Sequence, residues 1–352
     1  QSSENHTLCK EEARFIGEKT LKVGDKEITA EKIIIAAGSR PFTPPIEGLE
    51  EIDYLTSKEA LKLDECPEEI VMIGGGYISL ALAHFYHRMG AEVTILERGE
   101  RLLKREDKDI SKKITEIAEE KFNVFTQVSA SKVVEEKGKK AVYAEKEKGM
   151  EQRFTGDEVL VATGRKPNTD KLEVEEAGLK TVERGFLEVD EYLETNIDGI
   201  YGLGDIAGNY MFKHSANLEA EHVFKNSYAG NEYPVDYTAM PHAVFTSPQI
   251  AGVGKTEQEL EKEDEDFATA SYNYSGTGMG MALKEEDGFV KVIAASDGEI
   301  LGCHIIGPEA SVLIHEVLVA MKSGNKNIKD IKDTVHIHPA LNEVVSRAFQ
   351  KM

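Results

Sequence analysis

Residues 70–79 read Ile-Val-Met-Ile-Gly-Gly-Gly-Tyr-Ile-Ser, and this stretch decides the fold. Its apolar start predicts a buried strand over Ile70–Ile73, its glycines predict a tight turn, and the residues beyond them predict a helix over Tyr77–Met89. A strand over Glu92–Glu97 and an amphipathic helix near Ile110–Lys121 are expected next. Alternating strands and helices predict a parallel sheet that is covered by helices, which is an α/β architecture.

The glycine-rich turn has the features of a dinucleotide-binding site. Gly74 permits the tight turn, and Gly76 lets the backbone approach a pyrophosphate, whose charge the amides at the helix start stabilise. Glu97 lies about 20 residues further on, at the end of the next strand, where its carboxylate can accept both ribose hydroxyls and repels a 2′-phosphate. We therefore predict an NAD(H) site that comprises Gly74, Gly75, Gly76, Tyr77, Ile78, Ser79 and Glu97.

Three residues modify this interpretation. Ser79 replaces the third glycine of the usual fingerprint, which is a mild departure because the serine side chain is small. Arg98 and Arg101 could neutralise Glu97 or bind a 2′-phosphate, and they could equally be exposed surface residues. NADP(H) therefore stays open as an alternative to NAD(H).

Length and composition limit the class of protein. The 352 residues exceed what one hydrophobic core usually fills, so two or three domains are expected. The 42 basic and 64 acidic residues give a net charge of -22, which excludes nucleic acid and anionic membranes as partners because both bind through clustered Lys and Arg. No apolar run approaches the ~20 residues of a membrane helix, and the polar start is not a signal peptide.

The cysteines argue against a local redox centre. Cys9, Cys66 and Cys303 show neither CxxC nor CxxxxC spacing, so neither a metal cluster nor a redox disulfide is predicted among them. This usage indicates a reducing compartment, the cytoplasm.

Other segments predict how the chain is divided. The apolar run Ile33–Ile35 leads into Ala36-Ala37-Gly38-Ser39-Arg40-Pro41, and residues 158–165 repeat this order of apolar run, small residue, Gly and Arg. The repetition predicts that the chain leaves one domain, forms another and returns. A strand within Gly199–Asp205 and a helix beginning near Phe212 follow.

The last third of the sequence predicts a separate α+β domain. Its expected strands are Ala243–Phe245, Phe289–Ala294 and Ile300–Ile306, and its expected helices are Ser311–Lys322 and Pro339–Lys351. The charged run Glu257–Asp266 is interpreted as a solvated helix face.

The order of these motifs resembles the pyridine nucleotide–disulfide oxidoreductases, over essentially the whole chain. The motifs are residues 36–41, the 74–79 fingerprint, residues 162–168, Gly202-Leu203-Gly204-Asp205 and His336-Ile337-His338-Pro339. The last of these, with the Glu that follows, is most similar to dihydrolipoamide dehydrogenase. The resemblance implies a partial Rossmann-like FAD domain (residues 1–65 and 181–236), an NAD domain (66–180) and a C-terminal α+β dimerisation domain (237–352).

The resemblance also implies residues for two cofactors, FAD and NAD. Asp205 is expected to bond the ribityl chain, although without the motif order it is most simply a strand-end carboxylate that caps Ala207 or Gly208. Amides at the start of the following helix are expected to face the pyrimidine end of the flavin, because a helix N-terminus stabilises negative charge on a reduced flavin. The flavin set is Ala37, Gly38, Ser39, Asp205, Met211, Phe212, Lys213 and His214, and Val128 and Gly164 complete the cofactor-binding residues.

Two departures from the family pattern affect these expectations. Family members begin with a further strand, a GxGxxG turn and a helix carrying CxxxxC, on the order of 100 residues, that the given sequence does not contain. We therefore expect the stated chain not to complete an FAD site or a redox disulfide unaided. Ala81 stands where the family usually has a Glu near the nicotinamide, which predicts looser geometry for hydride transfer.

His338 and Glu343 form the candidate acid–base pair. Pro339 suits a first helical position, which predicts His338 at a helix start with Glu343 just over one turn beyond. The carboxylate could then bond one imidazole nitrogen and raise the basicity of the other. An N-cap histidine beside an ordinary surface Glu explains the residues equally well without the resemblance. The resemblance favours a thiol acid–base pair that reaches the partner's disulfide across a two-fold interface, with His336 behind it.

The function implied is that of an NAD-dependent, dihydrolipoyl dehydrogenase-like homodimer. Electrons would pass from a small dithiol or lipoyl-domain substrate through an enzyme disulfide and FAD to NAD+. A mercuric reductase is the nearest alternative, but such enzymes usually lack this histidine and carry C-terminal cysteines, which residues 347–352 do not include. An NAD(P)H-dependent flavin oxidase, diaphorase or transhydrogenase, and a truncated inactive nucleotide-binding dimer, also stay open.

Overall fold

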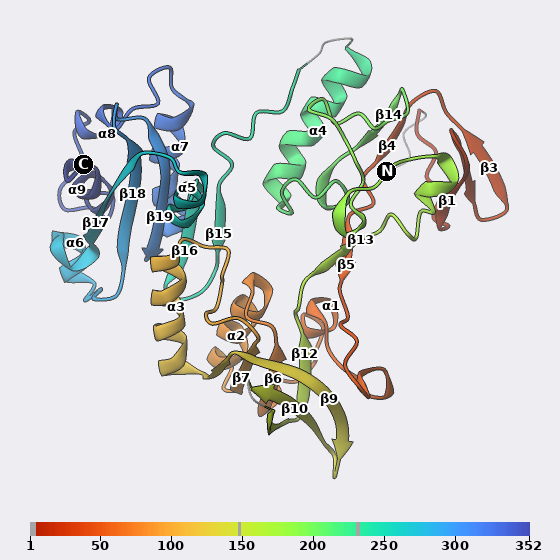
Figure 1. Cartoon of the computed structure of the whole chain (residues 1–352), viewed down its shortest axis with the longest axis horizontal. Coiled ribbons are helices and arrows are strands. Elements are labelled where there is room, and N and C mark those ends of the chain that lie inside the picture. The colour runs from red at the N-terminus through yellow and green to blue at the C-terminus, as the bar shows by residue number, and fades with distance from the viewer. Residues whose placement is uncertain (1–4, 147–148, 230–232) are drawn as a thin grey trace. The chain divides into compact units, whose positions relative to one another are not determined.

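The computed structural model describes residues 5–146, 149–229 and 233–352, and the chain divides into two compact units (Figure 1). Unit 1 consists of Gln1–Phe42 and Arg165–Tyr237, and unit 2 consists of Thr43–Gly164 and Thr238–Met352. The chain thus leaves unit 1 and returns to it, as the repeated strand motif predicts. The finer domain limits given above stay predictions.

Unit 1 is built from short paired strands and one long helix. An antiparallel sheet has the order β1-β2-β3, β4 pairs in parallel with β14, and β5 pairs antiparallel with β13. The strands are β1 Ala13–Gly17, β2 Thr20–Val23, β3 Lys26–Thr29, β4 Ile33–Ile35, β5 Ser39–Pro41, β13 Arg165–Pro167 and β14 Ile200–Gly202. The helices are α4 Lys213–Tyr228 and the 3-10 helices η2 Val174–Ala177, η3 Glu183–Gly185 and η4 Gly204–Ile206.

The first half of unit 2 contains the predicted α/β pattern. A parallel sheet has the order β12-β6-β7-β8, and an antiparallel sheet of order β11-β10-β9 accompanies it. The strands are β6 Glu69–Ile73, β7 Glu92–Glu97, β8 Asn123–Thr126, β9 Val128–Glu136, β10 Lys139–Lys146, β11 Met150–Gly156 and β12 Glu158–Val161. The helices are η1 Leu49–Glu51, α1 Ser57–Ala60, α2 Tyr77–Arg88 and α3 Lys108–Lys121.

The parallel sheet is centred on strands that are apolar on both faces, β6 and β12. Ile70, Val71, Met72 and Ile73 of β6 are all buried, as expected for a parallel strand covered on both sides. β6 and β7 run side by side in register from Glu69 to Ile73, so the turn after β6 lies beside the end of β7. The predicted strand, turn and helix around Gly74 are therefore confirmed.

The second half of unit 2 is the predicted α+β part. Its antiparallel sheet has the order β15-β16-β19-β18-β17, with α7 against β16 and β19 and α9 against β17 and β18. The strands are β15 His242–Val244, β16 Gln249–Gly254, β17 Phe267–Asn273, β18 Phe289–Ala295 and β19 Ile300–Gly307. The helices are α5 Glu257–Glu263, η5 Tyr274–Gly276, α6 Gly278–Ala282, α7 Ala310–Lys322, α8 Lys329–Lys332 and α9 Glu343–Gln350.

The two halves of unit 2 share one hydrophobic core. Val244, Ile250 and Ile306 of the antiparallel sheet belong to the same buried cluster as Leu80 of α2 and Ile114 of α3. A shared core means that the parallel sheet and the α+β half support each other, because removing either would expose apolar surface of the other.

Two sequence predictions need correction. The last helix does not begin at Pro339 but at Glu343, because Glu343 and Val344 donate their amides three residues back, to Ala340 and Leu341, and regular helix starts only there. The charged run is helical only over Glu257–Glu263, and it is not simply solvated, because the Glu257 carboxylate bonds the buried ammonium of Lys291.

Candidate functional site

The glycine-rich turn of unit 2 needs glycine for packing at its first two positions. Gly74 has φ +109, and a Cβ there would stand 2.6 Å from the Ala162 carbonyl oxygen. A Cβ on Gly75 would stand 2.5 Å from the Leu102 side chain. Gly76 differs, because a Cβ there would meet nothing within 4 Å and the residue is exposed at the start of α2. Open space beside a helix N-terminus is what a pyrophosphate requires.

The Glu97 carboxylate lies directly against this turn. Its Oε2 accepts the amide of Gly75 at 2.7 Å, and its Oε1 accepts the amide of Gly99 at 2.6 Å. Each carboxylate oxygen has a second lone pair, so the group can still accept ribose hydroxyls. Arg101 bonds Glu100 and Ser111 instead, which favours the role of Glu97 as a ribose acceptor over a phosphate site at Arg101.

The remaining predicted nucleotide residues have different surroundings. Ser79 is fully buried and its hydroxyl lies 3.7 Å from the Met72 sulfur, so it fills the helix–strand contact where the fingerprint usually has glycine. Ile78 is half-buried against the shared core of unit 2. Val128 is buried at the start of β9, and Gly164, with φ +140, directly precedes β13. Neither Val128 nor Gly164 is among the residues that hydrogen-bond to the turn.

The flavin residues of unit 1 gather around Asp205. Its Oδ2 accepts the Ser39 hydroxyl at 2.5 Å and lies 3.4 Å from Nε of Arg165. Arg165 also donates to the hydroxyl and the carbonyl of Ser39, at 2.6 and 2.8 Å. The two copies of the repeated strand motif therefore meet at this carboxylate, through the β5–β13 pair.

Asp205 does not act as the cap that was its alternative role. The amides of Ala207 and Gly208 donate to the Gly204 carbonyl, at 3.0 and 3.4 Å, rather than to Asp205. Its side chain keeps 26% of its surface exposed. This exposure and the ring of polar partners fit a carboxylate that accepts a ligand hydroxyl, as the ribityl chain of FAD offers.

The sequence analysis did not identify Glu219, which bonds the turn that contains Gly204 and Asp205. Glu219 is fully buried on α4, where its Oε2 accepts the Gly204 amide and its Oε1 accepts the Tyr237 hydroxyl, both at 2.6 Å. Burial, together with this carboxylate, raises the pKa of Tyr237. The available signal was spacing, because the buried residues of α4 recur at every fourth position: Ser215, Glu219, Val223 and Ser227.

The residues predicted to lie at the pyrimidine end of the flavin flank the start of α4. Phe212 is the N-cap, Met211 is half-buried, and Lys213 and His214 are exposed in the first turn. The rings of Phe212 and His214 stack, with centroids 5.2 Å apart and an interplanar angle of 10°. The positive end of the helix dipole is thus available at this surface.

His338 and Glu343 are paired in unit 2, as predicted. Nδ1 of His338 lies 3.0 and 3.2 Å from the two carboxylate oxygens of Glu343. The His338 side chain is 73% exposed, whereas that of Glu343 is 12% exposed. The bond from His338 lowers the pKa of Glu343 against the opposing effect of burial. The Glu343 carboxylate therefore orients the imidazole of His338 through Nδ1, and the rest of the ring is exposed.

His336, two residues before His338, has bonding partners of its own. Its side chain is 6% exposed, with Nε2 2.9 Å from Glu316 and Nδ1 3.0 Å from the Thr334 carbonyl oxygen. Burial raises the pKa of Glu316, and the bond to His336 opposes that rise. Both ring nitrogens of His336 are thus bonded within the protein, and its role in support of His338 stays a prediction.

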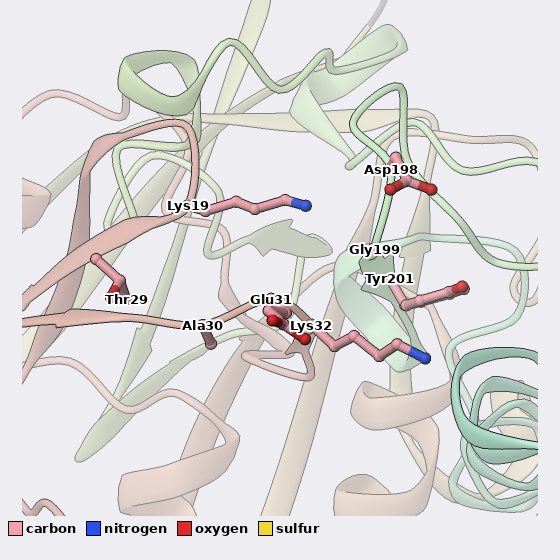
Figure 2. A pocket seen from close by; sticks show the side chains of 8 residues that line it. All are labelled: Lys19, Thr29, Ala30, Glu31, Lys32, Asp198, Gly199 and Tyr201. Carbon is pink, nitrogen blue, oxygen red and sulfur yellow. The ribbon is translucent and has the colours of Figure 1, made fainter.

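A cavity of about 670 Å³ in unit 1 does not coincide with these residues. Figure 2 shows two lysines and two carboxylates among its lining side chains. The lining residues are Lys19, Thr29, Ala30, Glu31, Lys32, Asp198, Gly199 and Tyr201. Charges of both signs indicate no preference for a phosphate, and the predicted cofactor residues do not line it.

Two kinds of feature are missing from the part of the chain that the structure describes. Within residues 5–146, 149–229 and 233–352, no three His, Cys, Asp or Glu side chains are grouped so that they could hold a metal ion. In the same ranges, no helix is long and apolar enough to cross a membrane.

Comparison with known proteins gives a consistent result. The family model "Pyridine nucleotide-disulphide oxidoreductase" matches residues 3–220, and the dimerisation-domain model of the same family matches residues 240–349. A mercuric reductase of Staphylococcus aureus is 37% identical over 93% of this chain and 60% of its own length. A dihydrolipoyl dehydrogenase of Bacillus subtilis is 35% identical over 97% of this chain and 74% of its own length.

A solved structure is also similar. The HOCl-induced flavoprotein disulfide reductase of Escherichia coli has a TM-score of 0.87 and 26% sequence identity, over 97% of this chain and 78% of that one. The chain thus spans 60% of the mercuric reductase and about three quarters of the dihydrolipoyl dehydrogenase and the solved reductase.

Proposed function

Because this chain belongs to the pyridine nucleotide-disulphide oxidoreductase family, we propose that it serves a flavin-dependent enzyme that passes electrons between a dithiol and NAD(H). The observation that carries this proposal is the His338–Glu343 pair. Flavin and nicotinamide chemistry is common to the whole family and does not separate one member from another. A paired, exposed histidine in the dimerisation part points to a reaction that transfers a proton.

The pair suits the oxidation of a thiol. A dithiol must lose a proton before its sulfur can attack a disulfide, because the thiolate is the nucleophile. The open side of His338 can accept that proton, and the Glu343 carboxylate stabilises the imidazolium that results. Asp205 and the start of α4 would hold FAD, which would supply the acceptor for the electron pair.

A homodimer is part of the proposal. Residues 240–349 match a dimerisation domain, and several large apolar side chains of this part are exposed in the single chain. They include Val335 at 94%, Ile337 at 75% and Val319 at 70% exposure. A second copy would cover this surface, and His338 would then face a site that the partner completes. A lipoyl group as the dithiol and a cytoplasmic location belong to the same proposal.

The nearest competing function is mercuric reduction, since relatives of that name are about as similar. We expect the complete, flavin-loaded enzyme to reduce NAD+ with dihydrolipoamide, and to oxidise neither NADH nor NADPH faster with Hg(II) than with dye acceptors. A rise in absorbance at the band of the reduced nicotinamide measures NAD+ reduction, and a fall at the same band measures oxidation by Hg(II). Efficient Hg(II)-dependent oxidation without dithiol activity would replace the dithiol proposal with the mercuric one.

Glu97 is proposed to select NAD(H). Replacing Glu97 with Ser should weaken NADH binding by about tenfold, the scale of one or two lost hydrogen bonds to a charged group, and should weaken NADPH binding less. Fluorescence titration of both nucleotides measures the two dissociation constants. Glu92→Gln, at the exposed opposite end of β7, is the matched control. An equal loss for both nucleotides would show that Glu97 supports the turn, through Gly75 and Gly99, without selecting the ribose.

A further inference from the structure

We infer that the buried carboxylate of Glu106 ties the nucleotide-binding turn to the α+β half of unit 2, so that NAD(H) affinity depends on a Tyr77–Glu106–His242 chain. Tyr77 begins α2, Glu106 precedes α3, and His242 begins β15. Glu106 and His242 are positioning residues here, because they act through Tyr77 and the turn. The inference rests on the proposed nucleotide site.

The segment before Glu106 is first attached to the turn itself. The amide of Leu103 donates to the Gly75 carbonyl at 2.9 Å. Leu102 is fully buried and occupies the space that a side chain at Gly75 would need. A movement of residues 102–106 would therefore displace the turn.

The Glu106 carboxylate then joins the two sides. It is 1% exposed, its Oε1 accepts the Tyr77 hydroxyl, and its Oε2 lies 2.8 Å from Nε2 of His242. Burial opposes its ionisation, but the bonds from His242 and Tyr77 outweigh this and lower the pKa of Glu106. Breaking either bond would leave a buried charge short of a donor, which strongly favours an intact chain.

Residues beside Glu106 fix the segment to the α+β half a second time. The side-chain amide of Gln258 donates to the Glu106 carbonyl at 2.8 Å. The neighbouring Asp107 accepts the amide of Glu257 at 3.1 Å and the ammonium of Lys291 at 2.8 Å. Residues 106–107 are thus held against α5 and β18. Tyr77 is held with them, because its hydroxyl bonds Glu106.

Restraint of the helix start has a consequence for binding. A pyrophosphate gains most from amides that already point at it, because ordering them on binding reduces affinity. Tyr77 follows Gly76 directly, so its hydroxyl bond orients the first turn of α2. Loss of His242 should then weaken nucleotide binding, although His242 is on a different sheet from the turn.

The experiment is a double-mutant cycle on NADH binding to the flavin-loaded enzyme, followed by fluorescence titration. His242→Phe should raise the dissociation constant about fivefold to tenfold, the scale of one lost hydrogen bond of ordinary net strength. His242→Gln should restore most of the affinity, since its amide can donate to Glu106. In a Tyr77→Phe background, His242→Phe should add little, because the chain is already broken.

Controls separate this inference from others. Tyr143→Phe, which removes a hydroxyl bonded to Glu136 on the β9–β10 hairpin, and Glu119→Gln, exposed on α3, should leave the constant unchanged. The KM for NAD+ should rise in His242→Phe while the KM for the dithiol stays constant, a split that general unfolding would not give. Unchanged NADH binding in His242→Phe overturns the inference. If Glu97→Ser also leaves binding unchanged, the nucleotide site itself is wrong.

Discussion

Replacing His338 with Gln in the complete, flavin-loaded enzyme is expected to slow dihydrolipoamide oxidation by about 100-fold or more, the scale of a lost general base. The reason is geometric, because Glu343 bonds Nδ1 and leaves the rest of an exposed ring to meet the thiol. Glutamine can keep a hydrogen bond to Glu343 but cannot take up a proton at neutral pH. Steady-state rates of NAD+ reduction measure the effect.

NADH-to-dye reduction provides the internal control for this variant. That reaction needs no proton from a thiol, so its rate should change less than about twofold in His338→Gln. Glu343→Gln should slow dithiol oxidation less than His338→Gln, because it weakens the imidazolium without removing the base. His6→Gln, an exposed histidine of unit 1, should change neither rate. If both activities of His338→Gln fall together, the residue supports folding or dimerisation and its catalytic role is withdrawn.

The pH dependence of the pair follows from the direction of one shift. The bond from His338 lowers the pKa of Glu343 below its ordinary value of about 4.3. Glu343 therefore stays ionised throughout the range in which a histidine titrates, and the fall in dithiol oxidation on acidification should follow the imidazole alone. Glu343→Gln should shift that fall to lower pH, because the imidazolium loses its stabilising partner and the ring then takes up a proton less readily.

Some elements of the fold could be predicted because one local pattern determined them. β7 was predicted with its observed ends, since its apolar core and its closing Glu97 both mark a parallel strand. The helix after Gly76 was found because glycines and a following apolar stripe give an unambiguous start. The Glu97 contact with the turn also followed from the pattern, since neighbouring parallel strands end at the same edge.

Contacts between segments distant in the sequence could not be predicted in the same way. Glu257 was assigned to a solvated face because it lies in a run of acidic residues, yet its carboxylate bonds a buried lysine 34 positions away. The start of α9 was placed at Pro339 because proline suits a first helical turn, but the amides fix it four residues later. For Glu257 the deciding partner, Lys291, lies far away in the sequence. For α9 the partners are local, and the preference of proline for a first helical turn did not decide where the helix starts.

Lys291 is the centre of the strongest of these hidden contacts. Its side chain is 2% exposed in the middle of β18, and its ammonium bonds Asp107, Asp109 and Glu257. Asp107 is itself fully buried, and its folded-state pKa is lowered even though burial opposes this, with Lys291 and His304 among the groups that favour the charged form. Three acidic side chains thus depend on one ammonium, and two of them flank the start of α3.

Replacing Lys291 with Met should therefore lower the free energy of unfolding by about 3–5 kcal/mol, the usual result of removing one partner from a buried ion pair. Methionine fills similar space, so the loss reports charge and hydrogen bonding rather than a cavity. Urea unfolding followed by circular dichroism measures it. Lys112→Met, an exposed lysine on α3, should stay within about 0.5 kcal/mol of the unchanged protein.

The sign of the pH effect makes this prediction specific. In the unchanged protein the folded pKa of Asp107 is lowered, so its stabilising contribution is present above the unfolded value of about 3.9 and is lost as the pH falls through the folded value. Without the ammonium, burial raises the pKa of Asp107, and protonation then relieves the unpaired charge. The destabilisation of Lys291→Met should consequently be smaller at pH 5 than at pH 8. A loss that is the same at both pH values would mean that packing around β18, and not the buried charge of Asp107, sets the stability of this part of unit 2.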